Sequence, residues 1–250
     1  MKAFRAVHGR LAALTNLVPP PADSPKPANA PLADALKVNE PNDGSPGYAI
    51  VILGIQQDFT SPSRWYSLPQ AALDSVIHKI NAASRLAARF DAPVLYAQQE
   101  PDSATGKAVF RFLARDHNAG ASQHGADKRL ETVPGFRFST PAGDAFSNDE
   151  FDTFLRKQGI GHLFLAGIDG ATSIARTART AIAHGYRVSF IRDGIFTAFE
   201  RKWDRQLRAF EACAAFAISS EEFGEFAATV QRAKEVRSRI ELALETGTRN

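Results

Sequence analysis

The chain has 250 residues, of which 44% are hydrophobic, and a formal net charge of +3 at pH 7. This length is sufficient for one sizeable buried core, and the apolar fraction is ordinary for a globular protein. No segment approaches the roughly 20 consecutive apolar residues of a transmembrane helix. Basic and acidic residues are mixed along the chain instead of forming a basic stripe, so we expect neither membrane insertion nor nucleic-acid binding.

Residues 1–46 differ in composition from the rest of the chain. Apolar residues occur there at helical spacing with Lys2 and Arg10 among them, and no acidic residue precedes Asp23. A run of prolines that begins at Pro19 ends any helix, and the stretch after it has the composition of a linker. We expect a flexible arm that packs on a neighbouring subunit in a cytoplasmic protein. The alternative is an organelle transit peptide, which is also basic and poor in acids.

From Tyr48 onward, strand-like segments alternate with segments of helical periodicity. Such alternation predicts parallel strands joined by right-handed helical crossovers. The predicted fold class is α/β, a three-layer Rossmann-like sandwich with a mostly parallel six-stranded sheet and helices on both faces. The predicted strands span 48–55, 93–98, 136–140, 162–168, 187–192 and 215–218, and the predicted helices span 68–90, 148–158, 171–185, 202–213 and about 219–246.

Local signals refine the second half of this prediction. Ser147 is a plausible N-cap for the helix that follows it, and Ser219 and Glu222 have the spacing of a capping box. The single cysteine, Cys213, cannot form an internal disulfide and lies among apolar residues, so we expect it to pack in the core.

The last predicted helix carries an apolar stripe that suggests self-association. We therefore divide the chain into an arm (1–46), an α/β domain (47–223) and a helical extension (224–250) that packs on the domain or on a partner subunit, and we expect a homo-oligomer. The stripe consists of Phe223, Phe226, Val230, Ala233 and Val236.

Ligands of doubly wound sheets bind beyond the carboxyl ends of the strands. This rule places residues 54–59, 98–135, 140–146 and 169–173 around one crevice. A glycine-rich dinucleotide or phosphate motif is absent from the sequence, and the crevice segments lack histidines at metal-ligand spacing. We therefore expect no cofactor and no metal there, and a small molecule is the candidate ligand.

Four sequence blocks, taken in order, carry a family likeness. They are Gly54-Ile55-Gln56-Gln57-Asp58-Phe59 after an apolar strand, Asp144-Ala145-Phe146 before a helix, Gly167 to Arg179, and Gly185-Tyr186-Arg187-Val188 followed by Asp193. Together they resemble the isochorismatase-like cysteine hydrolases over about residues 48 to 223. This resemblance implies the same α/β fold. It also implies that an unusual cis peptide can occur at Ile168–Asp169.

The resemblance also indicates where a catalytic triad would lie. Amide-cleaving members use an Asp that takes the proton of a nucleophilic Cys and a Lys that stabilises the thiolate. The matching positions here are Gly54, Thr140 and Ser173. Members that cleave a vinyl ether lack the Cys but keep the acid, which Gly54 cannot replace. We therefore expect a catalytically degenerate member with a binding, regulatory or assembly role.

Two alternatives to this prediction remain open. The first is an active hydrolase of a small amide or ester, with Ser173 as nucleophile, His117 or His124 as base and Asp58 as the orienting acid. The second is a purely structural subunit of an oligomer. In simpler interpretations, Ser173 only begins a helix and Asp58 only braces its loop. The candidate pocket residues are Gln57, Asp58, Asp169, Ser173, His117 and His124.

Overall fold

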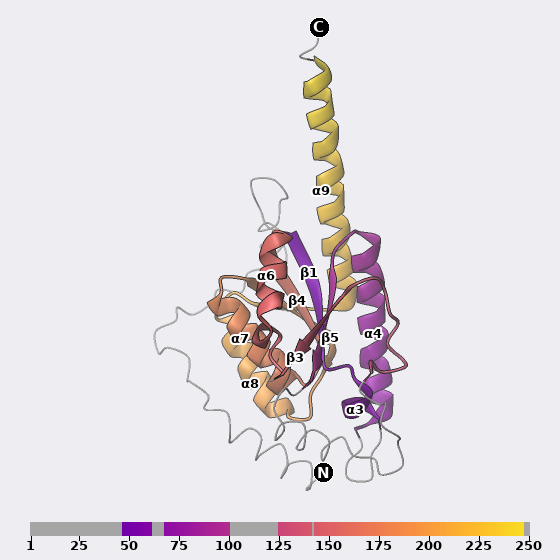
Figure 1. The fold of residues 1–250 in the computed structure, drawn as a ribbon, viewed down its shortest axis with the longest axis vertical. Helices are drawn as coiled ribbons and strands as arrows, with labels where there is room; N and C mark the ends of the chain where they lie inside the picture. The colour runs from indigo at the N-terminus through magenta and orange to yellow at the C-terminus, as the bar shows by residue number, and fades with distance from the viewer. Residues whose placement is uncertain (1–46, 62–67, 101–124, 142, 248–250) are drawn as a thin grey trace.

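The computed structural model describes residues 47–61, 68–100, 125–141 and 143–247. The expected arm at 1–46 lies outside these ranges. One six-stranded sheet of parallel strands runs through the described part of the chain in the order β3-β2-β1-β4-β5-β6 (Figure 1). The predicted fold class is therefore confirmed. The strands are β1 (Gly47–Leu53), β2 (Val94–Gln99), β3 (Phe136–Thr140), β4 (Ile160–Ile168), β5 (Arg187–Phe196) and β6 (Phe216–Ile218).

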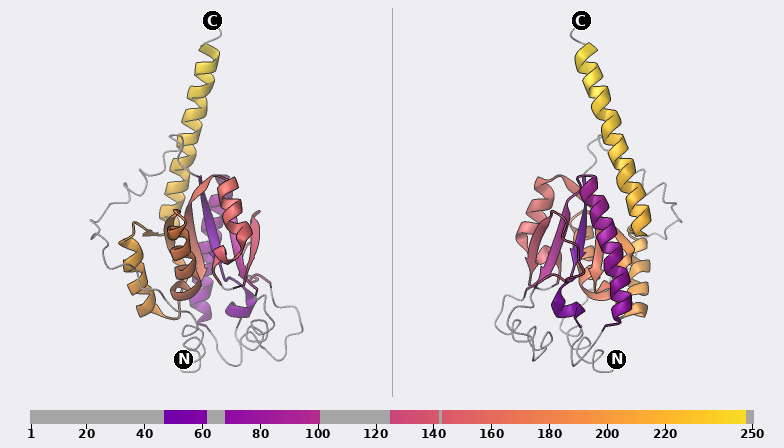
Figure 2. Two further views of the ribbon diagram at one scale, coloured as in Figure 1. Left: turned by 60° about the vertical axis from the view of Figure 1, so that its left-hand side comes forward. Right: turned by 90° about the vertical axis from the view of Figure 1, so that its right-hand side faces the viewer.

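Helices cover both faces of this sheet. Helices α4 and α9 lie on one face, and α6, α7 and α8 lie on the other (Figures 1 and 2). The longer helices are α4 (Gln70–Arg89), α6 (Asp149–Lys157), α7 (Ala175–Ala183), α8 (Glu200–Glu211) and α9 (Ser220–Gly247), and the short turns are α3 (Gln57–Thr60), η1 (Ala145–Ser147) and η2 (Gly170–Ile174).

Strand β1 shows why the apolar runs of the sequence become central strands. Ile50 and Ile52 are buried in the core under α4 and α9, whereas Val51 and Leu53 are buried in the core under α6, α7 and α8. Because both faces of the strand are covered, an alternating polar pattern would place polar groups in a core. A continuous apolar run is therefore the pattern that suits β1.

Two local predictions were wrong. The N-cap of α6 is Asn148, whose side chain accepts a hydrogen bond from the Glu150 amide at 2.9 Å, while Ser147 belongs to η1. Cys213 is exposed, because α8 ends at Glu211 and its last turn places Phe210, not Cys213, against the sheet. The apolar residues around Cys213 continue beyond Glu211, where α8 ends, so they did not indicate a buried position on that helix.

The start of α9 matches the prediction. The Ser219 amide donates to Glu222 Oε2 at 2.6 Å and the Glu222 amide donates to Ser219 Oγ at 3.1 Å, which is a capping box. The helix then runs without a break past the expected domain boundary at 223/224. None of the described helices has the length and apolar character needed to cross a membrane.

Candidate functional site

The carboxyl end of β1 lies at the point where the order of successive strands across the sheet changes direction. Leu53, the last residue of β1, pairs with Ala97 of β2 on one side and with Gly167 of β4 on the other. The strand order runs outward from β1 in opposite directions through β2 and β4. Crevices at such switch points are the usual ligand sites of doubly wound folds.

A small pocket opens at this point of the sheet. Its volume is about 10 Å³, which is room for about one water molecule. The positions that the resemblance matches to the family's Asp, Lys and Cys all line it, so the structure brings these three together. The lining residues are Leu53, Gly54, Ala97, Gln99, Thr140, Gly143 and Ser173.

The polar groups of this pocket are hydroxyls and an amide. Thr140 Oγ1 donates to the Gln98 carbonyl at 3.0 Å, so its proton is already engaged. Ser173 Oγ has no hydrogen-bond partner among the described residues, and Gln99 contributes a neutral side chain. Within the described part of the chain, the pocket is lined by no side chain that exchanges a proton near neutral pH.

Gly54 has a backbone conformation that excludes a side chain. Its φ is +67°, and a β-carbon built there would lie 2.4 Å from the Ile168 carbonyl oxygen. The Gly54 amide also donates to the Ala97 carbonyl at 3.2 Å, which holds this backbone against β2. An aspartate at this position would need the ends of β1 and β4 to move apart.

Gly143 closes the pocket over Ser173. Its φ is +70°, and a β-carbon built on it would lie 3.0 Å from Ser173 Oγ and 3.2 Å from Gln99 Oε1. Neither Gly143 nor Gln99 is among the pocket residues predicted from the sequence. The available signal for Gln99 was its place at the end of the second predicted strand, one residue beyond the predicted boundary.

The two glutamines after β1 join neighbouring loops. Gln56 is fully buried, accepts from the Gln99 amide at 2.7 Å and donates to the Gln99 carbonyl at 3.3 Å. Gln57 Nε2 donates to the Ala126 carbonyl at 3.2 Å and does not line the pocket. Asp58 is buried on α3, also away from the pocket lining. The side chains of Gln56 and Gln57 fix the loop that follows β1.

A charged cluster holds the segment after residue 124 against α4. Arg129 binds Asp127 at 2.6 Å and Asp74 at 2.7 Å, and the Asp127 amide donates to the Ile55 carbonyl at 3.0 Å. Burial raises the pKa of Asp127, but hydrogen bonds from Arg129 and Thr60 outweigh this effect and lower it to about 2. The carboxylate therefore stays ionised and braces the loop beside the pocket.

Asp169 follows a cis peptide bond between Ile168 and Asp169, as the resemblance implied. Its Oδ1 accepts from the Ala171 amide at 2.8 Å and from Thr197 Oγ1 at 3.2 Å, and its Oδ2 accepts from the Ala198 amide at 2.8 Å. Asp169 does not line the pocket. The carboxylate caps η2 and ties it to the segment after β5, which leaves little capacity for binding a ligand.

Ser173 lies in η2, which follows the Asp169 cap and leads directly into α7. The two loop histidines expected to approach it, His117 and His124, lie outside the described residues. His162 is buried at the start of β4, where its Nε2 lies 2.9 Å from Ser189 Oγ, and His184 caps the far end of α7. In the described ranges, no three His, Cys, Asp or Glu side chains are grouped as metal ligands.

Comparison with known families identifies the class of protein that this fold and pocket represent. Residues 48–222 match the model of the isochorismatase domain. The chain therefore belongs to the isochorismatase family. The match ends within the first turn of α9, so the rest of that helix lies beyond the family domain. No curated protein matches the sequence significantly.

Solved structures of low sequence identity share the fold. The N-carbamoylsarcosine amidase of Thermoplasma acidophilum aligns with a TM-score of 0.57 and 19% identity, over 70% of this chain and 96% of the amidase. A cysteine hydrolase of Pseudomonas syringae pv. phaseolicola aligns with a TM-score of 0.62 and 13% identity, over 73% and 93%. The zinc complex of the Pyrococcus horikoshii pyrazinamidase aligns with a TM-score of 0.58 and 19% identity, over 70% and 99%.

Proposed function

We propose that this chain is a non-hydrolytic member of the isochorismatase family, with a role in binding, regulation or assembly. The observation that carries this proposal is the composition of the pocket at the carboxyl end of β1. Gly54, Thr140 and Ser173 line it, and none of the described lining residues is a carboxylate, lysine, histidine or cysteine.

The chemistry of hydrolysis explains why this composition matters. Cleavage of an amide requires an activated nucleophile and a group that protonates the departing amine. A serine hydroxyl is a poor nucleophile unless a base accepts its proton, and a glutamine amide such as that of Gln99 cannot act as that base. The backbone at Gly54 adds a second obstacle, because it has no room for the acidic side chain that the resemblance places there.

The size of the pocket favours assembly over small-molecule binding within the proposed role. Ligand pockets of proteins generally enclose roughly 300–1,000 Å³, whereas the space between the lining residues is about 10 Å³. A role that depends on the fold as a rigid unit does not require that space.

One observation favours the alternative of a serine-based hydrolase. The Ser173 hydroxyl lines the pocket, immediately before α7. The start of a helix stabilises negative charge, as a serine nucleophile and its tetrahedral intermediate would require. Removal of the Ser173 hydroxyl therefore decides between the two functions.

The test is a hydrolysis assay of the full chain against small amides and esters. Because two similar structures are named as an N-carbamoylsarcosine amidase and a pyrazinamidase, the panel includes N-carbamoylsarcosine and pyrazinamide, each with and without added Zn²⁺. We expect no saturable turnover, and no difference between the native chain and the Ser173→Ala variant. Ser238→Ala, at an exposed site on α9, is the matched control.

Saturable turnover that is lost in Ser173→Ala and retained in Ser238→Ala would overturn the proposal in favour of the serine hydrolase. Thermal unfolding of each variant shows whether a loss of activity merely reflects a loss of folded protein.

A further inference from the structure

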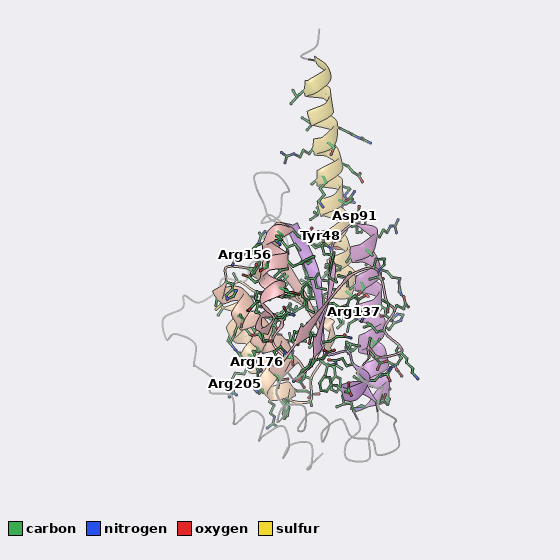
Figure 3. All side chains as sticks on the ribbon, viewed as in Figure 1. Tyr48, Asp91, Arg137, Arg156, Arg176 and Arg205 are labelled. Atoms are coloured by element: carbon green, nitrogen blue, oxygen red, sulfur yellow. The ribbon has the colours of Figure 1, made fainter. Side chains whose placement is uncertain are left out.

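Helix α9 leaves the domain about halfway along its length. Phe226 is buried with its ring centroid 5.0 Å from that of Tyr48, at the amino end of β1. Among the residues of the helix whose burial the structure describes, Val230 is the last buried one. Beyond Val230, residues 231–247 project past the amino ends of the strands (Figures 1 and 3). At about 1.5 Å per residue, this projecting segment is roughly 25 Å long.

The projecting segment carries an apolar face that the domain does not cover. Val236, Ile240 and Leu244 are 56%, 55% and 66% exposed, although they continue the apolar stripe that the first half of α9 buries. They are spaced at intervals of four residues and so lie on one side of the helix. Ala233, Val236, Ile240 and Ala243 follow one another at intervals of three, four and three residues, which is the spacing of a coiled-coil seam.

The charge along the projecting segment is asymmetric. Residues 231–239 contain four basic residues and one acid, whereas residues 240–247 contain two acids and no lysine or arginine. Two copies that pair in parallel would place the basic parts together. Two copies that pair antiparallel place each basic part beside the acidic part of the other copy, and opposite charges flanking a seam set the orientation of coiled coils. The basic residues are Arg232, Lys234, Arg237 and Arg239, and the acids of the second part are Glu241 and Glu245.

From this self-complementarity we infer that residues 231–247 of α9 pair antiparallel with the same segment of a second copy of this chain, about a two-fold axis at Ile240. In this arrangement Ile240 packs on Ile240 of the second copy, and Val236 of each copy packs on Leu244 of the other. Lys234 and Arg237 then lie on the same side of the seam as the acidic part of the second copy. The interface is isologous and closes as a dimer.

The position of the segment is compatible with this pairing. The isochorismatase domain ends at residue 222, so the projecting segment is not needed to complete the family fold. It also projects from the end of the sheet opposite to the pocket, so the paired helices leave the carboxyl ends of the strands uncovered (Figure 2). The inference is independent of the function of the pocket.

The first test measures the molar mass of the full chain by sedimentation across a wide range of concentrations. We expect a monomer–dimer equilibrium, at least about tenfold weaker in Ile240→Glu, because a carboxylate at the axis would be buried against its own copy. Ser238→Glu adds the same charge on the opposite side of the helix and should leave the equilibrium unchanged. A native chain that is monomeric throughout, or an Ile240→Glu variant that dimerises as the native chain does, would overturn the inference.

The second test determines the orientation by disulfide formation in a Cys213→Ser background. Val236→Cys and Leu244→Cys proteins should form few disulfides when oxidised separately and should cross-link readily with each other when mixed. Efficient cross-linking of each variant with itself would overturn the antiparallel arrangement and indicate parallel helices. Arg237→Glu should weaken the dimer, and addition of Glu241→Arg should restore it, which a seam without this charge pairing would not show.

Discussion

The carbonyl oxygen of Ile168 occupies the space that a side chain at Gly54 would need. A β-carbon built on Gly54 would lie only 2.4 Å from this oxygen, and the φ of Gly54 is +67°. Both residues stand at the carboxyl ends of neighbouring strands, β1 and β4. Glycine at this position means that the pocket lacks the family's acid. It is also the residue that the present backbone requires.

The first prediction concerns the stability of Gly54→Ala. We expect it to lower the free energy of unfolding by about 2–4 kcal/mol, since it adds a steric conflict to the cost of a left-handed conformation. Gly159 has a similar φ of +63° but no atom within 4 Å of its β-carbon position. Gly159→Ala should therefore cost only about 1 kcal/mol. Urea unfolding of the two variants measures the difference, and equal losses would refute the steric argument.

The same contact predicts the result of restoring the family residues. We expect the triple variant Gly54→Asp, Thr140→Lys and Ser173→Cys to unfold at a lower temperature than the double variant Thr140→Lys and Ser173→Cys, and to hydrolyse none of the panel amides. The reason is that the aspartate backbone cannot adopt the geometry of Gly54 without displacing Ile168. Efficient amide cleavage by the triple variant would show that the strand ends can move apart readily.

Asp169 is predicted to contribute to stability through hydrogen bonds to its carboxylate. Asp169→Asn replaces one acceptor oxygen by an NH₂ group, which then faces a donor, either the Ala198 amide or the Ala171 amide. We expect a loss of about 1–3 kcal/mol in the free energy of unfolding. The exposed Asp204 on α8 offers a control, because Asp204→Asn should change stability by less than about 0.5 kcal/mol. Calorimetry of both variants checks this prediction.

The burial of His162 leads us to predict that the stability of the fold depends on pH. Burial, with a smaller contribution from Arg187, lowers the pKa of His162 to about 3 in the fold. The unfolded chain, with a histidine pKa of about 6.5, therefore binds a proton between these values when the folded protein does not. Stability is full above pH 6.5 and falls as the pH falls, by roughly 1 kcal/mol between pH 7 and pH 5.5.

The variant His162→Gln isolates this effect, because an amide can still bond to Ser189 but does not titrate. The slope of unfolding free energy against pH should flatten in His162→Gln. It should persist in His78→Gln, which changes an exposed histidine on α4. A slope that is the same in the native chain and in His162→Gln would assign the pH dependence to other groups.

Asp127 gives a prediction at lower pH. Its folded pKa of about 2 lies below the unfolded value, so its stabilising contribution is present above about pH 4 and is lost as the pH falls towards 2. Asp127→Asn should cost about 1–2 kcal/mol at pH 7, and the difference from the native chain should narrow in acid. Asp74→Asn removes a second, exposed acidic partner of Arg129, whose guanidinium also donates to Gln70, and should cost less than about 0.5 kcal/mol. Urea titrations at several pH values test both variants.

The fold was largely predictable because its signals are local in the sequence. Strand β1 is an apolar run because both faces of it are buried, and helices such as α4 repeat their apolar residues at the helical period. The capping box at Ser219 and Glu222 involves residues only three positions apart. The wrong N-cap prediction at Ser147 was also a local matter, because Asn148, one residue later, is an equally good N-cap.

The site was less predictable, because its lining depends on which strand ends meet. Gly54, Thr140 and Ser173 were assigned to it through the family resemblance, but Gln99 and Gly143 complete it only through tertiary proximity. A residue at a strand end can face the pocket or turn back into the fold. Asp169 does the latter because the Ala171 and Ala198 amides lie within reach of its carboxylate.

Residue types and short spacings were enough to predict the order of strands and helices, the family, and the glycine at the position where the resemblance places an acid. Two features depend on how the strands and helices pack together: the backbone of Gly54 leaves no room for that acid, and α9 leaves the domain after Val230. The four-residue spacing of apolar side chains is the same in Phe226 and Val230, which are buried, and in Ile240 and Leu244, which are exposed. Periodicity fixes the side of the helix on which a residue lies, and the extent of the sheet beneath that helix fixes whether the side is covered.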